Sequence, residues 1–282
     1  MHSGSRRNGA PGFAALSLAP ALHQATIEAG YPEPSPIQAH AIPVILAGRD
    51  ILACAPAGAG RTAAFVLPIL HHLLEHQRAG HPALRALVLA STHERARHID
   101  ACFRRFAVGS GLRGCAVSGG ADRSGQVEAL RRGVDVLVAT PSRLLHLLCQ
   151  GEVDLGDVRH FVLDEAGRVL DPGFFDDVRR IAGAIPTERQ TLVFSAGLPG
   201  EVRALAAKLL RDPVLVTAGL EPSVAGAGLS PRANDERPRL RAIERVTRSR
   251  ARRSARASAE TFARPPRPAK PRDKADTANR DR

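Results

Sequence analysis

Between residues 51 and 216 the sequence alternates short, nearly continuous apolar runs with longer stretches of amphipathic, helix-like pattern. Apolar runs of this kind are typical of strands that are buried on both faces. The runs are Ile51–Cys54, Ala86–Leu89, Cys115–Val117, Val134–Val138, Phe161–Leu163, Thr191–Phe194 and Val214–Val216. The helix-like segments are Thr62–Glu75, Arg95–Phe106, Gln126–Arg131, Arg143–Cys149, Phe174–Ala182 and Glu201–Leu210. This alternation predicts an α/β fold, a doubly wound parallel sheet with helices on both faces.

Small, hydroxylated or charged residues follow most of the apolar runs. The segments concerned are residues 55–62, 91–94, 118–120, 140–143, 164–167 and 195–197. In a parallel sheet the carboxyl ends of the strands meet at one edge, and ligands bind beyond that edge. The sequence therefore predicts one composite ligand site built from several of these segments.

The segment after the first run has the composition of a phosphate-binding loop. It consists of Ala55, Pro56, Ala57, Gly58, Ala59, Gly60, Arg61 and Thr62. Gly58 and Gly60 let backbone N–H groups turn toward an anion, and the following helix directs its positive end to the same point. We expect the Thr62 hydroxyl to bind a magnesium ion. The general pattern has lysine where this chain has Arg61, and small-residue turns also precede helices that bind nothing.

Two neighbouring carboxylates, Asp164 and Glu165, end the run Phe161–Leu163. In a sheet that also carries a phosphate loop, this pair predicts a Walker B arrangement. Asp164 would hold the magnesium ion, and Glu165 would polarise the attacking water. The alternative is that both are solvated acids of a turn.

From Phe13 to about Val216, the order and spacing of these segments resemble the first RecA-like domain of the DEAD-box helicases. Residues 30–38 (GYPEPSPIQ) resemble the family's Q motif, and residues 55–62 resemble its AxxGxGKT loop. Residues 91–96, 119–120, 140–143, 164–167 and 195–197 resemble PTRELA, GG, TPGR, DEAD and SAT, in that order. The resemblance implies a RecA-like (P-loop NTPase) fold, ATP as ligand and Mg²⁺ as cofactor.

The resemblance also implies a role for each matched residue. Gln38 would recognise the edge of adenine, and Phe13 would stack near the base. The residues implied to line the RNA backbone are Thr92, Gly119, Gly120, Thr140, Pro141 and Arg143. Ser195 and Ala196 would link ATP hydrolysis to the handling of RNA.

Several positions depart from the family pattern. Gly167 lacks the last carboxylate of DEAD, and Gly197 lacks the hydroxyl of SAT. His93 and Arg95 replace an arginine and a leucine of PTRELA. A planar, forked guanidinium at Arg61 does not match the compact ammonium of lysine. We therefore expect weakened coupling and an altered phosphate contact.

In the family a second RecA-like domain supplies arginine fingers and half of the RNA channel. No segment of the present sequence resembles HRxGRxxR. The absence of a finger costs about 10³–10⁵ in phosphoryl-transfer rate. We expect no autonomous unwinding, and a partner protein is one possible source of the second domain.

The alternating pattern stops beyond Ala218. Residues 220–282 carry 17 Lys/Arg against 8 Asp/Glu, which accounts for +9 of the total charge of +12. We expect a domain at residues 13–218 between a disordered N-terminus of residues 1–12 and a disordered, Arg-rich basic tail of residues 219–282. Such a tail favours RNA through the release of counterions, and a solvated tail without a partner is the alternative.

The sequence contains no apolar run of about 18 residues and no N-terminal stretch typical of a signal peptide. We therefore expect a cytoplasmic protein that does not contact membranes. Three functional hypotheses remain open. The chain is an ATP- and RNA-binding helicase module that is weak or inactive alone, a non-catalytic RNA-binding pseudo-helicase, or a truncated helicase remnant.

Overall fold

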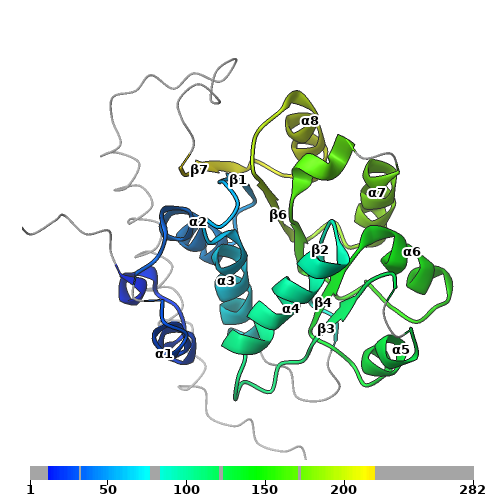
Figure 1. The fold of residues 1–282 in the computed structure, drawn as a ribbon, viewed down its shortest axis with the longest axis horizontal. Helices are drawn as coiled ribbons and strands as arrows, with labels where there is room; N and C mark the ends of the chain where they lie inside the picture. Colours follow the sequence, from blue (N-terminus) through cyan, green and yellow to red (C-terminus); the bar gives the residue numbers. More distant parts are fainter. Residues whose placement is uncertain (1–11, 32, 77–82, 121–122, 171–172, 220–282) are drawn as a thin grey trace, which may run out of the picture. The chain divides into compact units, whose positions relative to one another are not determined.

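The computed structural model describes residues 12–31, 33–76, 83–120, 123–170 and 173–219. Within them, a seven-stranded sheet has the order β3-β4-β2-β5-β6-β1-β7 (Figure 1). The strands are β1 (Ile51–Cys54), β2 (Ala86–Leu89), β3 (Gly114–Val117), β4 (Val136–Ala139), β5 (His160–Leu163), β6 (Gln190–Ser195) and β7 (Val214–Thr217). All neighbouring strands are parallel, which confirms the predicted fold class.

The strand register brings the predicted ligand segments to one edge of the sheet. Cys54, the last residue of β1, pairs with Ser195, the last residue of β6. Leu89, the last residue of β2, pairs with Leu163, the last residue of β5. The loops that follow these four strands therefore leave the sheet along the same edge, which we call the site rim.

Helices cover both faces of the sheet. They are α1 (Pro20–Glu28), α2 (Pro36–Leu46), α3 (Arg61–Glu75), α4 (His93–Phe106), α5 (Arg123–Arg131), α6 (Pro141–Cys149), α7 (Phe174–Ala184) and α8 (Gly200–Leu209), with short 3₁₀ helices η1 (Phe13–Leu16) and η2 (Ala166–Leu170). Side chains of α1 to α4 form one apolar core with the sheet, and those of α5 to α8 form another. Ile51 and Ala53 face the first core, whereas Leu52 and Cys54 face the second, as the period of two in a strand requires.

Two buried helices hold the phosphate loop. Helix α3 follows the loop directly, and eleven of its residues are buried. Helix α2 packs along α3 and begins after Ser35, with Pro36 in its first turn, where a missing N–H costs nothing. The start of α2 therefore lies beside the loop.

The seven predicted strands are confirmed, with ends that shift by at most a few residues. The six predicted helices are also confirmed, although α4, α5 and α6 begin two or three residues earlier than their apolar pattern. The periodicity did not predict α1 or α2. Predictions for residues 1–11 and 220–282, which include the basic tail, lie outside the described residues.

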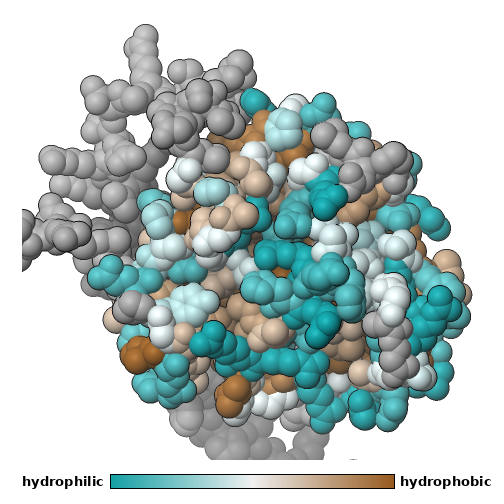
Figure 2. All heavy atoms as spheres, in the orientation of Figure 1, coloured by the Kyte–Doolittle hydropathy of each residue, from teal (hydrophilic) through white to brown (hydrophobic). Residues whose placement is uncertain are grey.

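The described surface is mainly polar. Figure 2 shows hydrophilic side chains over most of the visible face, with apolar ones in small, separate patches. In the described ranges, none of the helices is both long enough and apolar enough to cross a membrane. The same ranges contain no group of three or more His, Cys, Asp or Glu residues that is suited to a metal ion.

Candidate nucleotide and RNA site

The phosphate loop joins β1 to α3 at the site rim. Gly58 and Gly60 have φ values of 79° and 89°, in the left-handed region that favours glycine. A Cβ atom at Gly60 would lie 2.4 Å from Gln38 Nε2, so any side chain there would displace its neighbour. With Arg61 as the first residue of α3, the positive end of the helix dipole lies at the loop, while its predicted contact with phosphate stays a prediction.

Ser35 and Gln38 brace this loop from the side of α2. The Gln38 amide donates to the carbonyl oxygen of Gly60 at 3.0 Å. The Ser35 hydroxyl donates to the carbonyl of Ala59 at 2.7 Å, and its backbone N–H donates to Gln38 Oε1 at 2.9 Å. Two bonds thus fix the loop to the Q-motif-like segment, a link that sequence spacing did not reveal, and the third joins Ser35 to Gln38 within that segment.

A hollow of about 350 Å³ opens between this brace and the loop. Its lining residues are Tyr31, Glu33, Ser35, Pro36, Ile37, Gln38, Gly58, Ala59, Gly60, Ala218 and Gly219. Phe13 is not among them, because it is buried in the first core. Its predicted stacking on a base stays a prediction. Tyr31, for which the sequence predicted no role, contributes the aromatic ring at the hollow.

Asp164 lies at the end of β5 and is fully buried. Its Oδ2 accepts a hydrogen bond of 2.5 Å from Arg95 Nε, in helix α4. The same guanidinium donates through Nη2 to the hydroxyl of Thr62, at 3.0 Å. Among the described residues Asp164 Oδ1 has no hydrogen-bond partner. One arginine therefore joins the two residues that were predicted to hold magnesium.

Glu165 adopts a left-handed conformation, with φ of 56°, which is rare for a residue with a side chain. Its Oε2 accepts a short hydrogen bond from the hydroxyl of Ser91. Its Oε1 lies 4.0 Å from Arg61 Nη2 and 4.0 Å from Arg95 Nε. The carboxylate is thus bonded to one hydroxyl and flanked by two guanidinium groups, while its side chain stays 32% exposed.

Arg61 turns back beneath the loop. Its side chain is 6% exposed, and Nη1 donates to the carbonyl of Ala55 at 3.3 Å. Burial raises the pKa of the neighbouring Cys54 thiol, and the Arg61 charge opposes that rise. Cys54 is therefore a neutral thiol near pH 7 and not a nucleophile.

The residues of this site do not fit a magnesium ion in the arrangement described. Magnesium requires oxygen ligands at about 2.0–2.1 Å in near-octahedral geometry. Thr62 Oγ1 and Asp164 Oδ2 are both engaged by Arg95, which also places a positive charge where the metal would lie. Only the unpaired Asp164 Oδ1 favours a further cation. The predicted Mg²⁺ site is thus occupied by a side chain of the protein.

The two positions that lack their family groups lie together. A Cβ atom at Gly167 would be 3.7 Å from the hydroxyl of Ser195, at the end of β6. Ser195 is buried and accepts a hydrogen bond of 3.4 Å from the backbone N–H of Gly197. Ala196 is exposed. The structure therefore brings the DEAD-like and SAT-like segments into contact, while their coupling role stays a prediction.

Thr92 and the glycines after β3 occupy the rim next to α4. Thr92 is the N-cap of α4, and its hydroxyl accepts a hydrogen bond from the N–H of Arg95 at 3.1 Å. Gly119 and Gly120 come directly after Ser118, the residue that follows β3. His93 Nδ1 makes a short contact with the Ser118 hydroxyl, so that α4 and the end of β3 are linked.

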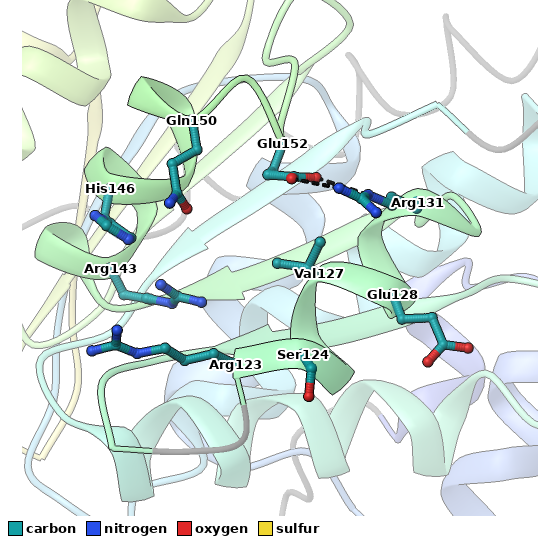
Figure 3. Close-up of a pocket in the computed structure, with 9 residues that line it drawn as sticks. All are labelled: Arg123, Ser124, Val127, Glu128, Arg131, Arg143, His146, Gln150 and Glu152. Atoms are coloured by element: carbon teal, nitrogen blue, oxygen red, sulfur yellow. Dashed lines mark hydrogen bonds and ion pairs between the residues drawn. The ribbon is translucent and has the colours of Figure 1, made fainter.

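Thr140, Pro141 and Arg143 start helix α6. Thr140 is its N-cap and Pro141 its first residue. Arg143 is 7% exposed, and its Nε donates to Gln126 Oε1 at 3.3 Å. Arg143 also lines a hollow of about 420 Å³ with Arg123, as Figure 3 shows, and the Arg131–Glu152 ion pair lines another part of it. These residues share the rim, and their contacts with RNA stay predictions.

Comparison with known proteins agrees with this geometry. Residues 35–205 match the DEAD/DEAH box helicase family model. The chain is 42% identical over 207 residues to a probable ATP-dependent RNA helicase, ddx27, of Dictyostelium discoideum, an alignment that covers 73% of this chain and 26% of that protein. It is also 42% identical over 191 residues to DEAD-box ATP-dependent RNA helicase 30 of Arabidopsis thaliana, covering 67% of this chain and 32% of that protein.

A third relative, DEAD-box ATP-dependent RNA helicase 52A of rice (Oryza sativa subsp. japonica), is 37% identical over 228 residues, covering 74% of this chain and 38% of that protein. The matched region thus spans between a quarter and two fifths of these relatives. It includes the Q-motif-like brace, the phosphate loop, the carboxylate pair and the SAT-like turn, which the structure gathers on one rim. The chain belongs to the DEAD/DEAH box helicase family.

Proposed function

We propose that this chain binds an adenine nucleotide in the hollow beside the phosphate loop, binds RNA along the site rim, and is weak or silent as an ATPase on its own. The observation that carries the proposal is the convergence of three segments that are distant in sequence. The brace of Ser35 and Gln38, the loop at Gly60 and the carboxylates after β5 meet at one edge of the sheet.

The Gln38 side chain is suited to an adenine edge. An amide offers two N–H donors and two acceptor sites on its oxygen, and Gln38 uses one of each on Gly60 and Ser35. The remaining N–H of the amide can donate to N7 of adenine, and its oxygen can accept from the N6 amino group. Guanine presents two acceptors at the same edge, so the amide oxygen would be left unpaired against O6.

The carboxylates support the proposed weakness in hydrolysis. Phosphoryl transfer requires a positioned water and positive charge aimed at the transferring group. Oε2 of Glu165 is bonded to Ser91, and Oε1 lies 4.0 Å from both Arg61 and Arg95, so the carboxylate is drawn toward protein groups as well as toward a water. The same contacts keep both guanidinium groups on protein carboxylates. The non-catalytic alternative draws its support from this arrangement.

RNA is proposed as the second ligand on two grounds. The relatives are RNA helicases by name, and the residues implied to contact the RNA backbone lie along one rim. Residues 220–282 add a net charge of +9, which favours binding to phosphates with little sequence preference. A partner that supplies a second RecA-like domain and a cytoplasmic location remain expectations from the sequence.

The test is equilibrium binding of ATP and GTP to the wild-type chain and to Gln38→Ala. We expect ATP to bind more tightly, by about tenfold, because an unpaired polar group penalises the wrong base. Gln38→Ala should abolish this preference, whatever it does to the affinity for both nucleotides. Gln24→Ala, on the exposed face of α1, is the matched control and should keep the preference. Equal affinity for ATP and GTP in the wild type would contradict the proposal.

A further inference from the structure

Arg95 is the feature of the site that the family pattern does not account for. The resembled PTRELA element has leucine at this position, an apolar side chain without charge. Arg95 instead lies in the first turn of α4, and helical side chains lean toward the N-terminus of their helix. This direction carries the guanidinium to the rim between the phosphate loop and β5, where it contacts Thr62 and Asp164.

We propose that the Arg95 guanidinium takes the place of magnesium, so that this chain binds the phosphates of its nucleotide without a divalent cation. The proposal rests on the proposed nucleotide binding and states what holds the phosphates. Its basis is the pair of bonds from one side chain to the Thr62 hydroxyl and to Oδ2 of Asp164, in the two residues that were predicted to hold the metal.

Arg95 retains the donors that phosphate oxygens need. A guanidinium carries five N–H groups, and Arg95 uses one on Nε and one on Nη2. Its side chain is 19% exposed, so it is largely buried yet open at the rim. Asp164 and Thr62 fix its orientation, which lowers the entropy lost when an anion binds.

The balance of charge also removes the need for a metal. Asp164 and Glu165 contribute two negative charges, and Arg61 and Arg95 contribute two positive charges within 4.0 Å of them. Without Arg95 the cluster carries a net negative charge, which would repel a triphosphate unless a cation entered with it. With Arg95 the cluster is neutral, and a divalent ion would have to enter beside a fixed guanidinium.

Asp164 Oδ1 is the observation that points the other way. This oxygen is buried and unpaired within the described residues, and a cation would satisfy it. A metal at Oδ1 would still share the carboxylate with Arg95 and would lack the Thr62 hydroxyl, which the guanidinium already holds. The proposal therefore requires that the affinity for nucleotide be the same with and without a divalent metal ion.

The experiment measures the dissociation constant of ATP by calorimetry, in excess Mg²⁺ and in EDTA, for the full chain. We expect the two wild-type values to agree within about twofold. In Arg95→Leu, affinity in EDTA should fall by about ten- to a hundredfold, as expected for the loss of charge-assisted hydrogen bonds, and Mg²⁺ should restore much of it. Arg97→Leu, an exposed position on the same helix, is the control and should behave as the wild type.

A wild-type chain that binds ATP only in Mg²⁺ would overturn the inference while leaving the proposed function intact. A chain that binds no nucleotide in either buffer would overturn both. Arg95→Gln, which removes the charge but keeps an amide donor, repeats the test if Arg95→Leu does not fold. In this variant too, a dissociation constant that Mg²⁺ does not change would argue against the proposal.

A second measurement follows the metal directly. Mn²⁺ serves as a paramagnetic probe for Mg²⁺, and its binding to the protein with ATP is followed by electron paramagnetic resonance. We expect Arg95→Leu to hold Mn²⁺ in a protein-bound environment, whereas the wild type leaves the ion with the nucleotide in solvent. An identical protein-bound spectrum in the two proteins would mean that Arg95 does not replace the metal.

Discussion

The nucleotide-binding side of the site and its catalytic side differ in how far they keep the family pattern. On the binding side, Ser35 and Gln38 hold the phosphate loop through two hydrogen bonds. On the catalytic side, Gly167 and Gly197 lack polar groups, and arginines surround the carboxylates. Binding of a ground-state ligand and stabilisation of a transition state depend on different contacts, so one can persist without the other. The comparison therefore predicts a protein that holds nucleotide better than it hydrolyses it.

The largest expected effect concerns hydrolysis. We expect the chain to release phosphate at a near-background rate, with or without single-stranded RNA, because its sequence contains no HRxGRxxR-like motif and the loss of a finger costs about 10³–10⁵ in rate. Arg61→Lys should improve nucleotide binding more than turnover, since a phosphate-loop lysine acts on the ground state as well. Steady-state phosphate release from both proteins is the measurement. Strong RNA-stimulated turnover by the wild type would break the distinction between the two sides.

The next prediction concerns the helix and the strand that carry the two sides. His72 of α3, the helix that follows the phosphate loop, stacks on His160 of β5, the strand that precedes the carboxylates, with ring centroids 5.3 Å apart. Burial, reinforced by the nearby His72, lowers the pKa of His160 to about 4. The unfolded chain takes up this proton near its ordinary pKa of about 6.5, so stability should fall between about pH 6.5 and pH 4, by about 3 kcal/mol.

Urea unfolding at a series of pH values measures this loss. His160→Gln should reduce the dependence on pH, because its side chain does not titrate in this range, and the remainder should come from His71 and His72, whose pKa values burial also lowers. His23→Gln, on helix α1 and away from the stacked pair, should leave the dependence unchanged. A stability that stays constant from pH 7 to pH 4.5 would show that the stacked pair is not held neutral.

A smaller effect sharpens the description of the binding side. Gly58 and Gly60 both have positive φ, so alanine at either costs about 1 kcal/mol in backbone strain. At Gly58 the added Cβ meets no atom within 4 Å, whereas at Gly60 it meets Gln38 Nε2 and Ser35 Oγ, at 2.4 and 2.8 Å. Gly60→Ala should therefore cost about 2 kcal/mol more than Gly58→Ala, as the brace breaks. Thermal unfolding of the two variants gives the difference, and equal losses would mean that the brace contributes little.

The smallest expected effect lies outside both sides. Removal of residues 220–282 should reduce the dependence of RNA affinity on salt. The slope of log affinity against log salt concentration should become shallower by about 0.7 for each RNA phosphate that the shortened chain no longer neutralises. Titration of a single-stranded RNA at several salt concentrations, with and without these residues, is the measurement. An unchanged slope would assign RNA binding to the rim alone.

The strands were predictable because each is buried on both faces and appears as a short apolar run. Helix α2 was not, because six of its eleven residues are buried and no polar face remains to give it a helical period. The rim was predictable from the small and polar residues that come after each strand, since parallel strands end at one edge.

The contact of Arg95 with Asp164 was not predictable. The two residues are 69 positions apart, and the contact depends on how α4 leaves β2 beside β5. The sequence marked Arg95 as a departure from the family pattern, but only the packed fold shows which group the guanidinium reaches. Similarly, Tyr31 is the sole tyrosine of the chain, yet only the fold places it at the hollow.

The left-handed backbone at Glu165 has a cost in stability. Glycine would relieve a strain of about 1 kcal/mol there. Selection for stability alone would therefore favour the loss of this carboxylate. The chain keeps Glu165 at that small cost, as proteins often do for residues of a functional site.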